Sequence, residues 1–361
     1  MTTETIDRPT LDMHAAEGFA GRMADMLNHG AAAVMISAGH RLGLFDLMAG
    51  QPAQTGQEIA QRGRLNERYL REWLAAMVTA GIMTYDPAAR RYGLPEEHAA
   101  CLTRGAALGN LAVYAQHVAL LGKLEDTTLR LIETGGGTDY GAYPCFHQLM
   151  AEDSEQTVTA GLFDHVLPLV PGIEQRLAAG IDVLDAGCGR GAALIAMARR
   201  YPQSRFVGYD LCGDAIEFAA RAAEDAGLAN LRFERRDMTG YVEPDRWDFV
   251  TSFDAVHDQK DPAALVRGLR ASLRPGGVYL MQDIGGSAFL EKNADFPMAT
   301  FLYAISLVHC TPVSIGQGGA GLGTMWGWET ALRFLWEAGF SSVEKHLLPH
   351  DPMNVWFVSH V

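Results

Sequence analysis

The sequence predicts an α/β protein: a mainly α-helical first half that contains a winged helix, then a doubly wound parallel sheet. In the first half, apolar residues recur at helical spacing around one short hairpin. After Gly180, short β-branched or apolar runs alternate with helical stretches, which is typical of parallel sheets. Because 361 residues exceed the size of one hydrophobic core, we expect two domains, over residues 1–175 and 176–361.

The first predicted elements are helices. Apolar residues over 26–48 follow helical spacing and predict one buried helix. Thr55, with Glu58 three residues later, forms the capping-box pattern of a short helix. Asn66 can cap a longer helix over residues 67–80.

A hairpin and a further helix complete the first half. Residues 82–85 and 91–94 have strand composition on either side of a turn at Asp86-Pro87, so helix, turn, helix and hairpin together predict a winged helix. Residues 108–132 predict one long helix. The run of three glycines at 135–137 then breaks it before an aromatic stretch over 140–146.

The second half contains five short runs with strand composition, separated by helical stretches. They cover residues 181–184, 205–209, 231–235, 247–252 and 277–282. An insertion over 288–323, a helix near 329–338 and a final apolar strand over 355–359 follow. This alternation predicts the parallel sheet.

One glycine-rich turn carries the strongest functional signal. In Val183 to Gly191, VLDAGCGRG, an apolar strand runs into Asp185 and three glycines before a helix begins. Glycines let a ligand lie against the backbone at the carboxyl end of a strand, where doubly wound folds bind ligands. The spacing G-x-G-x-G differs from the dinucleotide pattern G-x-G-x-x-G, and no Lys follows as in a phosphate loop.

Acidic residues end the next two strands. Asp210 follows the strand RFVGY, where a carboxylate can accept both hydroxyls of a ribose. Asp237 and Met238 follow the third strand and suit an adenine amino group and ring face. Three strand ends in this order predict a nucleoside-containing ligand.

These segments, together with LRPGG at residues 273–277, resemble the class I S-adenosylmethionine (SAM)-dependent methyltransferases, whose fold is Rossmann-like. The resemblance covers roughly the last half of the chain. It implies that SAM is the cofactor, with its methionine part on the glycine turn, its ribose on Asp210 and its adenine on Asp237 and Met238. The full set of cofactor-binding residues that we predict is Asp185, Gly187, Cys188, Gly189, Gly191, Asp210, Leu211, Asp237, Met238, Phe253 and Asp254.

The first half resembles the dimerisation half of small-molecule O-methyltransferases of the plant and antibiotic-tailoring kind. This resemblance implies a homodimer, a domain over 1–175 that dimerises and caps the substrate, and a small-molecule acceptor, most simply a hydroxyl. Two alternatives stay open. One is S-methylation of a small thioether acid, as in the methylthiohydroxybutyrate S-methyltransferases of dimethylsulfoniopropionate synthesis. The other is a winged-helix regulator that senses SAM and reads DNA.

The candidate catalytic residue is His257, which lies just past the fourth strand. A neutral imidazole there can take a hydroxyl proton as the methyl moves, although a histidine at this place can also only pack beside the cofactor. Tyr140 and Tyr143 are the alternative catalytic residues, since a thioether acceptor needs no base and their rings can face a sulfonium.

Substrate contacts are expected from two aromatic segments. Tyr140, Tyr143, Phe146 and His147 follow the glycine run and either line a pocket or anchor an ordinary loop. His309, Met325 and Trp326 flank the glycine-rich GQGGAGLG, which is either a lid or a surface loop.

Composition excludes several classes of partner. Lys and Arg number 29 against 43 Asp and Glu, and this net charge of -14 repels nucleic acid. The five cysteines are scattered without metal-ligand spacing, so we expect no metal and a reducing, cytoplasmic compartment. The N-terminus lacks a secretory pattern and is expected to be a frayed leader. The apolar run over 298–308 is about half the roughly 20 residues of a membrane span, which predicts a soluble protein.

Overall fold

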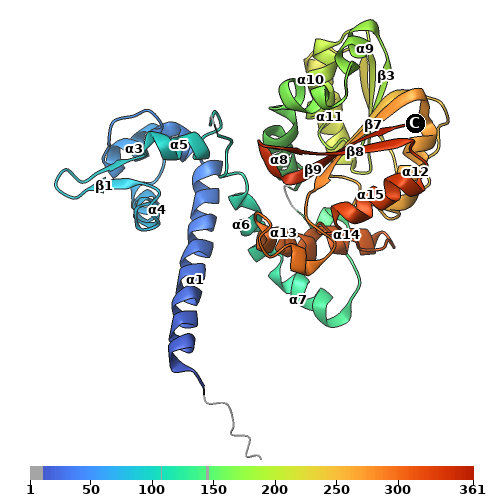
Figure 1. The fold of residues 1–361 in the computed structure, drawn as a ribbon. Coiled ribbons are helices and arrows are strands. Elements are labelled where there is room, and N and C mark those ends of the chain that lie inside the picture. Colours follow the sequence, from blue (N-terminus) through green and yellow to red (C-terminus); the bar gives the residue numbers. More distant parts are fainter. Residues whose placement is uncertain (1–10, 107, 144–145) are drawn as a thin grey trace, which may run out of the picture. The chain divides into compact units, whose positions relative to one another are not determined.

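The computed structural model describes residues 11–106, 108–143 and 146–361, with the side chains of Phe146 and His147 left out (Figure 1). The chain forms two compact units, residues 1–120 and 121–361. The domain boundary expected near residue 175 differs from this division. Residues such as Val158, Leu162 and Val166 are buried in the core that covers the sheet, so their segment packs with the second unit.

The first unit begins with a long helix, α1 (Met13–Arg41), which Asp12 caps by accepting a hydrogen bond from the backbone of Ala15. The buried helix expected over 26–48 is wrong in two respects. Most of α1 is exposed, and it ends before Gly43, whose positive φ of 68° starts a separate helix, α2 (Leu44–Met48). The expected frayed leader also overlaps α1, because the helix is already formed at Met13.

The winged helix is confirmed. Helices α3 (Gly56–Gly63) and α4 (Glu67–Thr79) begin at the expected caps, and the Thr55–Glu58 capping box is complete. Strands β1 (Thr84–Asp86) and β2 (Arg91–Gly93) pair antiparallel as the wing. The apolar face of α4 lies in the core of this unit, while its exposed charges pair along the helix, Arg68 with Glu72 and Arg71 with Glu67.

The next helices differ from the single long helix expected over 108–132. After α5 (Glu96–Leu102), the chain runs through turns into α6 (Ala115–Lys123) and then α7 (Glu125–Thr134), separated at Leu124. Helix α7 ends at the expected glycine run. Gly137 is needed for a close backbone approach, since a Cβ there would come within 2.1 Å of the Gly316 nitrogen.

The second unit is built on a seven-stranded sheet in the order β5-β4-β3-β6-β7-β9-β8, counted over the described residues. The parallel strands are β3 (Asp182–Ala186), β4 (Arg205–Asp210), β5 (Leu231–Arg235), β6 (Trp247–Phe253) and β7 (Leu273–Ile284). Strand β9 (Asp351–His360) runs antiparallel between β7 and β8 (Ser342–Leu348). The sheet is therefore mixed rather than parallel throughout, and β8, whose face is half-exposed, gave no clear apolar run in the sequence.

Helices cover both faces of the sheet, as in a doubly wound fold. Successive strand residues alternate between two cores, for example Val183 in one and Leu184 in the other. One face packs against α9 (Ile173–Ala179), α10 (Ala192–Arg200) and the π-helical turns Glu155–Thr159 and Leu162–Val166. The other packs against α12 (Pro262–Ser272) and α15 (Trp328–Glu337). Helix α11 (Gly213–Asp225) follows β4, and α8 (Phe146–Ser154) precedes the π-helical turns.

The insertion between β7 and α15 contains helices and loops. Its helices are a 3-10 turn Leu290–Lys292, α13 (Ala299–Ile305), a π-helical turn Ser306–Cys310 and α14 (Thr311–Gly316). The last three run on as one apolar stretch of 18 residues, Ala299–Gly316, longer than the run seen in the sequence and sufficient by length and composition for a candidate membrane span. The buried residues Leu302, Cys310 and Val313 pack it into the second unit, as in the core helix of a globular domain.

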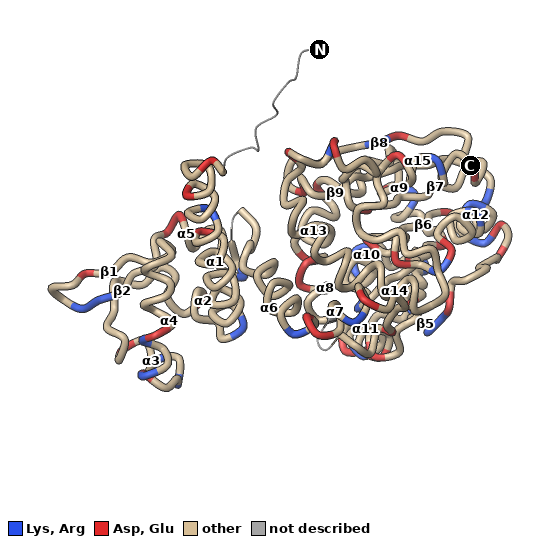
Figure 2. The backbone as a smooth tube through the Cα atoms, turned by 90° about the horizontal axis from the view of Figure 1, so that it is seen from below, with Lys and Arg blue, Asp and Glu red and all other residues tan. Residues whose placement is uncertain are grey.

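Charges of opposite sign are mixed along the described chain, and its described cysteines are unpaired. Figure 2 shows Lys and Arg positions interspersed with Asp and Glu rather than gathered on one element. Cys101, Cys188, Cys212 and Cys310 are free thiols, and Cys145 lies outside the described residues.

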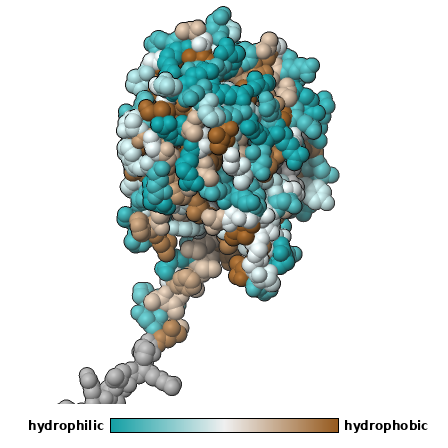
Figure 3. All heavy atoms as spheres, turned by 90° about the vertical axis from the view of Figure 1, so that its right-hand side faces the viewer, coloured by the Kyte–Doolittle hydropathy of each residue, from teal (hydrophilic) through white to brown (hydrophobic). Residues whose placement is uncertain are grey.

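The exposed stripe on α1 predicts that two chains associate through the first unit. Apolar side chains recur at helical spacing on one face and stay exposed, namely Phe19, Met23, Met26, Leu27 and Val34. Figure 3 shows brown, apolar residues on the part of α1 next to the grey tail. We expect Leu27→Glu, which places a charge on this stripe, to shift the chain towards monomer in light scattering at micromolar concentration. Asn28→Glu adds the same charge on another face and should leave the mass unchanged; a monomeric wild type would contradict the prediction.

Candidate functional site

The glycine turn after β3 forms one wall of the site. Gly187, Gly189 and Gly191 all have positive φ, of 82°, 52° and 74°. A Cβ on Gly187 would come within 2.4 Å of Ala255, and one on Gly191 within 2.3 Å of the Phe233 ring, so these two positions exclude side chains for packing. Above Gly189 a Cβ would meet nothing within 4 Å. The turn is therefore tightly packed underneath and open at its middle glycine, as a cradle for a ligand must be.

Buried hydrogen bonds fix this turn to the neighbouring strands. The Thr251 hydroxyl on β6 donates to Asp185 Oδ1 at 2.8 Å. Both the Gly187 and Cys188 amides donate to the Tyr209 carbonyl oxygen on β4. Burial raises the pKa of Asp185 to about 7, against the opposing effect of the Thr251 hydrogen bond. Burial also raises the pKa of the Cys188 thiol well above its usual value, so this thiol is neutral and acts by packing.

Asp210 lies at the end of β4, beside the turn. Its Oδ2 accepts from the Gly189 amide at 2.9 Å and its Oδ1 from the Cys212 amide at 2.8 Å. A carboxylate offers about four acceptor positions, so two remain for the paired hydroxyls of a ribose. The structure thus fits the group that the sequence predicted at this strand end.

The other predicted cofactor residues lie at the same edge of the sheet. Asp237 Oδ1 accepts from the Thr239 amide, which lowers the pKa of its carboxyl, and the side chain stays partly accessible. Met238 is buried in the core that packs on α12 and α15. Leu211 directly follows β4 and Phe253 is the last residue of β6; both are half-buried, and the Phe253 ring lies 6.0 Å from that of Trp356.

Asp254 lies beside the glycine turn, since its neighbour Ala255 packs against Gly187. It adopts a left-handed φ of 52°, a conformation that costs a non-glycine residue roughly 1 kcal/mol or more and that concentrates at functional sites. Its Oδ1 is buried without a hydrogen-bond partner among the described residues. Burial raises the pKa of Asp254 to about 7, while the nearby His257 lowers it. An unsatisfied carboxylate oxygen beside the glycine turn is suited to a donor or a cationic centre on a ligand.

His257 is buried at the centre of three carboxylates. Its Nδ1 lies 2.8 Å from Asp283 Oδ1 and 3.8 Å from Asp254 Oδ1, and its Nε2 lies 3.2 Å from Asp258 Oδ1. Burial by itself lowers the pKa of His257, but the charges on Asp283 and Asp258 outweigh it and hold that pKa well above its usual value. His257 is therefore a strong base whose Nδ1 is oriented by a buried carboxylate.

Asp283 at the end of β7 is itself held in place. Its Oδ1 accepts from the Ile284 amide at 2.8 Å and from the Trp326 indole nitrogen at 3.0 Å. Trp326 therefore supports the acid behind His257. Met325, its neighbour, packs in a small core cluster with Ile284 and Leu302.

Two of the predicted aromatic residues meet His309. The His309 ring lies 4.5 Å from that of Tyr143 and 5.9 Å from that of Tyr140. The Tyr143 hydroxyl donates to the Val308 carbonyl at 2.9 Å and bonds the Thr138 hydroxyl at 2.6 Å, so this residue anchors the segment after α7.

Tyr140 lies within electrostatic reach of both parts of the site. Burial raises the pKa of Tyr140 well above its usual value, and the carboxylates of Asp258 and Asp210 raise it further. Its phenol group therefore lies within electrostatic range of both the ribose acid, Asp210, and Asp258 of the His257 cluster. The side chains of Phe146 and His147, expected to line the same pocket, lie outside the described residues.

Asp258, Asp283 and Cys310 are the site residues that the sequence analysis missed. Asp258 stands next to His257, and burial raises its pKa, but His257 and His309 hold it below the usual value. Asp283 could have been found by taking the acid at the end of the fifth predicted strand. Cys310 gave no signal, because only the fold brings its Sγ within 4.8 Å of ligand atoms of His257 and Asp258. Such a group could hold a cation, but the Asp283 bond that orients His257 is the arrangement of a general base.

Comparison with known proteins identifies the two units. The family of Rv2258c-like winged HTH domains matches residues 30–104, and a methyltransferase domain family matches residues 177–309. A methyltransferase of Aspergillus campestris, ungE', is 29% identical over 189 residues, covering 48% of this chain and 52% of that protein. A ubiquinone biosynthesis O-methyltransferase of Leptothrix cholodnii is 33% identical over 107 residues, covering 29% of this chain and 45% of that protein. The chain thus spans about half the length of the curated relatives it matches.

Solved structures share the fold over almost the whole chain. A candidate O-methyltransferase of Nostoc punctiforme has a TM-score of 0.73 at 19% identity, covering 94% of this chain and 98% of its own. Human N-acetylserotonin methyltransferase, solved in complex with SAM, has a TM-score of 0.68 at 16% identity, covering 98% of this chain and 99% of its own. The chain therefore joins an Rv2258c-like winged HTH domain to a methyltransferase domain, in the fold that these solved structures share.

Proposed function

We propose that this methyltransferase transfers the methyl group of SAM to a hydroxyl of a small-molecule acceptor, as a homodimer in the cytoplasm. The observation that carries the proposal is His257, oriented through Nδ1 by the buried Asp283 and lying one strand away from the glycine turn. The human N-acetylserotonin methyltransferase structure, which contains SAM, and the ubiquinone biosynthesis O-methyltransferases support the choice of cofactor and of oxygen as the acceptor atom.

In this proposal, different residues bind different parts of the cofactor. The open middle of the turn at Gly189 accommodates the methionine part, and the free acceptor positions of Asp210 bind the ribose hydroxyls. Asp237 is accessible for the adenine amino group. When bound, SAM supplies an electrophilic methyl group on a positively charged sulfonium. The unsatisfied Asp254 oxygen would offer a carboxylate towards this charge.

His257 performs the proton transfer in this proposal. Its Nε2 would accept the proton of the acceptor hydroxyl while the methyl passes from the sulfonium sulfur to that oxygen, and Asp283 would stabilise the imidazolium that forms. The acceptor must compete with Asp258, which lies 3.2 Å from the same Nε2. Tyr140 and His309 form an aromatic wall that suits an acceptor with an apolar body.

A thioether acceptor is the alternative that the same site would permit. Methylating a neutral sulfur releases no proton, so His257 would have no proton to take. A DNA-reading regulator is disfavoured, because the exposed arginines of α4 are paired with glutamates on the same helix.

The first prediction concerns SAM binding, which we expect in the micromolar range. Asp210→Ala removes charge-assisted hydrogen bonds to the ribose and should weaken binding by roughly 1.5 to 3 kcal/mol, measured by calorimetry. Asp225→Ala removes the same charge from an exposed position at the end of α11 and should bind SAM as the wild type does. Unchanged affinity in Asp210→Ala would refute the assigned cofactor site.

The second prediction separates oxygen from sulfur acceptors. With a hydroxyl acceptor, His257→Ala should lower turnover by roughly 10²- to 10⁴-fold, the usual contribution of a general base, while SAM affinity stays nearly intact. With a thioether acceptor His257→Ala should matter little, and Tyr140→Phe should have the larger effect. Wild-type turnover in both variants would mean that the active site is assigned wrongly.

The third prediction follows from the carboxylates around His257. Because Asp283 and Asp258 raise the pKa of His257, the neutral base is populated only as the pH rises, so kcat/KM should increase towards alkaline pH. Asp283→Asn removes one negative charge and should move this limb of the pH profile to lower pH, besides lowering the maximal rate. A limb that does not move would argue that another group titrates.

A further inference from the structure

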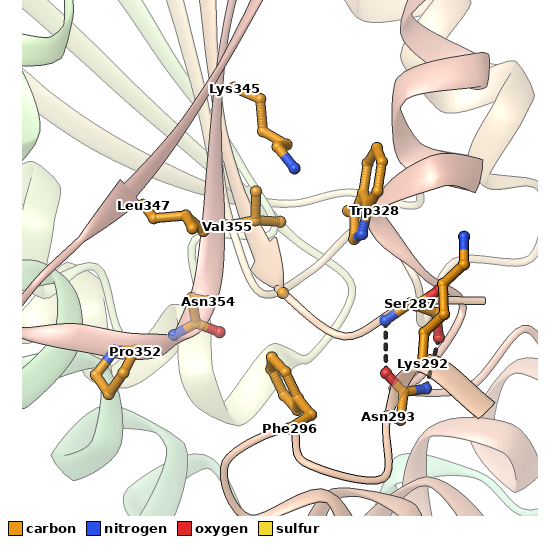
Figure 4. Close-up of a pocket in the computed structure, with 11 residues that line it drawn as sticks. Ser287, Lys292, Asn293, Phe296, Trp328, Lys345, Leu347, Pro352, Asn354 and Val355 are labelled. Atoms are coloured by element: carbon orange, nitrogen blue, oxygen red, sulfur yellow. Dashed lines mark hydrogen bonds between the residues drawn. The ribbon is translucent and has the colours of Figure 1, made fainter. Parts of the chain in front are cut away.

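A pocket of about 300 Å³ lies on the far side of β7 from the glycine turn (Figure 4). The loop after β7, the N-terminus of α15 and the ends of β8 and β9 line it. Gly285 permits the close approach of the strands at its base, since a Cβ there would come within 3.1 Å of the Asn354 backbone. The lining residues include none of the glycine turn or of the His257 cluster.

Most polar groups around this pocket already bind one another. Asn293 Oδ1 accepts from the Ser287 amide, while its Nδ2 donates to the Ser287 carbonyl and to the Tyr303 hydroxyl. The Ser287 hydroxyl donates to Glu329 at 2.6 Å, and Lys292 pairs with the same carboxylate at 3.5 Å. The polar groups of this wall are therefore hydrogen-bonded to one another, and the charge of Lys292 is balanced by Glu329.

Lys345 is the exception among the charged groups. The chain has only four lysines, and two of them, Lys292 and Lys345, line this pocket. Lys345 extends towards Trp328 with its Nζ 3.8 Å from the ring centre (Figure 4). Among the described residues no carboxylate forms an ion pair with Lys345, so its ammonium presents an uncompensated positive charge beside an indole face.

Asn354 supplies a second polar group without a partner. This residue is only 5% exposed, and its Oδ1 has no hydrogen bond among the described residues. Its Nδ2 donates to Asp351 Oδ1 at 2.7 Å, and the other oxygen of that acid accepts from the Trp356 indole. This bond fixes the carboxamide so that Oδ1 is the end turned towards the pocket (Figure 4). A buried acceptor of this kind requires a donor.

We propose that this pocket binds a small aromatic carboxylate that also carries a hydrogen-bond donor. The carboxylate pairs with the Lys345 ammonium, the hydroxyl or amino group donates to Asn354 Oδ1, and the ring packs between Trp328 and Phe296. The proposal does not rest on methyl transfer, because no catalytic or cofactor-binding residue lines the pocket.

Because the chain has four lysines, the reactivity of each can be measured separately. The full-length protein is acetylated with a limiting amine-reactive reagent, and the rate at each of the four lysines is read by peptide mass spectrometry. We expect millimolar 4-hydroxybenzoate to slow acetylation of Lys345 several-fold without affecting Lys123 or Lys260. Benzoate, which lacks the donor, and 4-hydroxybenzyl alcohol, which lacks the charge, should each require higher concentrations for the same protection.

Calorimetry with a variant completes the test. Lys345→Met keeps the apolar stem at an exposed position and should weaken 4-hydroxybenzoate binding roughly tenfold or more, whereas Lys123→Met should not change it. Three outcomes overturn the proposal: no protection of Lys345 by 4-hydroxybenzoate, equal protection at all four lysines, or equal potency of the three probes. Unchanged affinity in Lys345→Met would equally exclude Lys345 as the anion partner.

Discussion

Parallel strand pairing is the constraint on which the site depends. Because β3, β4, β6 and β7 run in one direction, their carboxyl ends meet at one edge of the sheet. That edge brings together the glycine turn, Asp210, the segment from Asp254 to His257, and Asp283. None of these contacts exists between neighbours in sequence, and each depends on the register of a different strand pair. The helices on both faces bury the strands and so fix that register.

The burial of charged side chains determines which chemistry is possible at this edge of the sheet. Four ionisable side chains, Asp254, His257, Asp258 and Asp283, share a space from which water is largely excluded. Removing one partner from a buried ion pair costs several kcal/mol, far more than an exposed pair contributes. The arginine–glutamate pairs on α4 are of the exposed kind and carry little stability. The fold therefore maintains a costly arrangement at the strand ends, which is expected of a site that must move a proton.

Two chemically different regions lie at this edge, one around the glycine turn and one in the pocket that the loop after β7 lines together with β8 and β9. On the side of the glycine turn, the unsatisfied groups include carboxylate oxygens of Asp254 and Asp283, which suit donors and cations. On the other side, the pocket presents an ammonium and a carboxamide oxygen, which suit an anion with a donor. Asp283 and Gly285 are two residues apart, so the loop after β7 belongs to both regions. The same strand end thus supports the base on one side and the pocket floor on the other.

The sequence by itself determined the elements that local chemistry defines. Patterns within a few residues were enough to predict the Thr55–Glu58 capping box, the wing, the five parallel strands, the glycine turn and Asp210. Patterns of this range could not predict the exposure of α1, the break at Leu124 or the pairing of β8 with β9, because these depend on which distant segment covers each face. The same holds for the roles of Trp326, Cys310 and Asn354. Only the tertiary structure decided these roles. The energy and the function of a buried charge or hydrogen bond depend on its partners, and folding brings those partners from elsewhere in the chain.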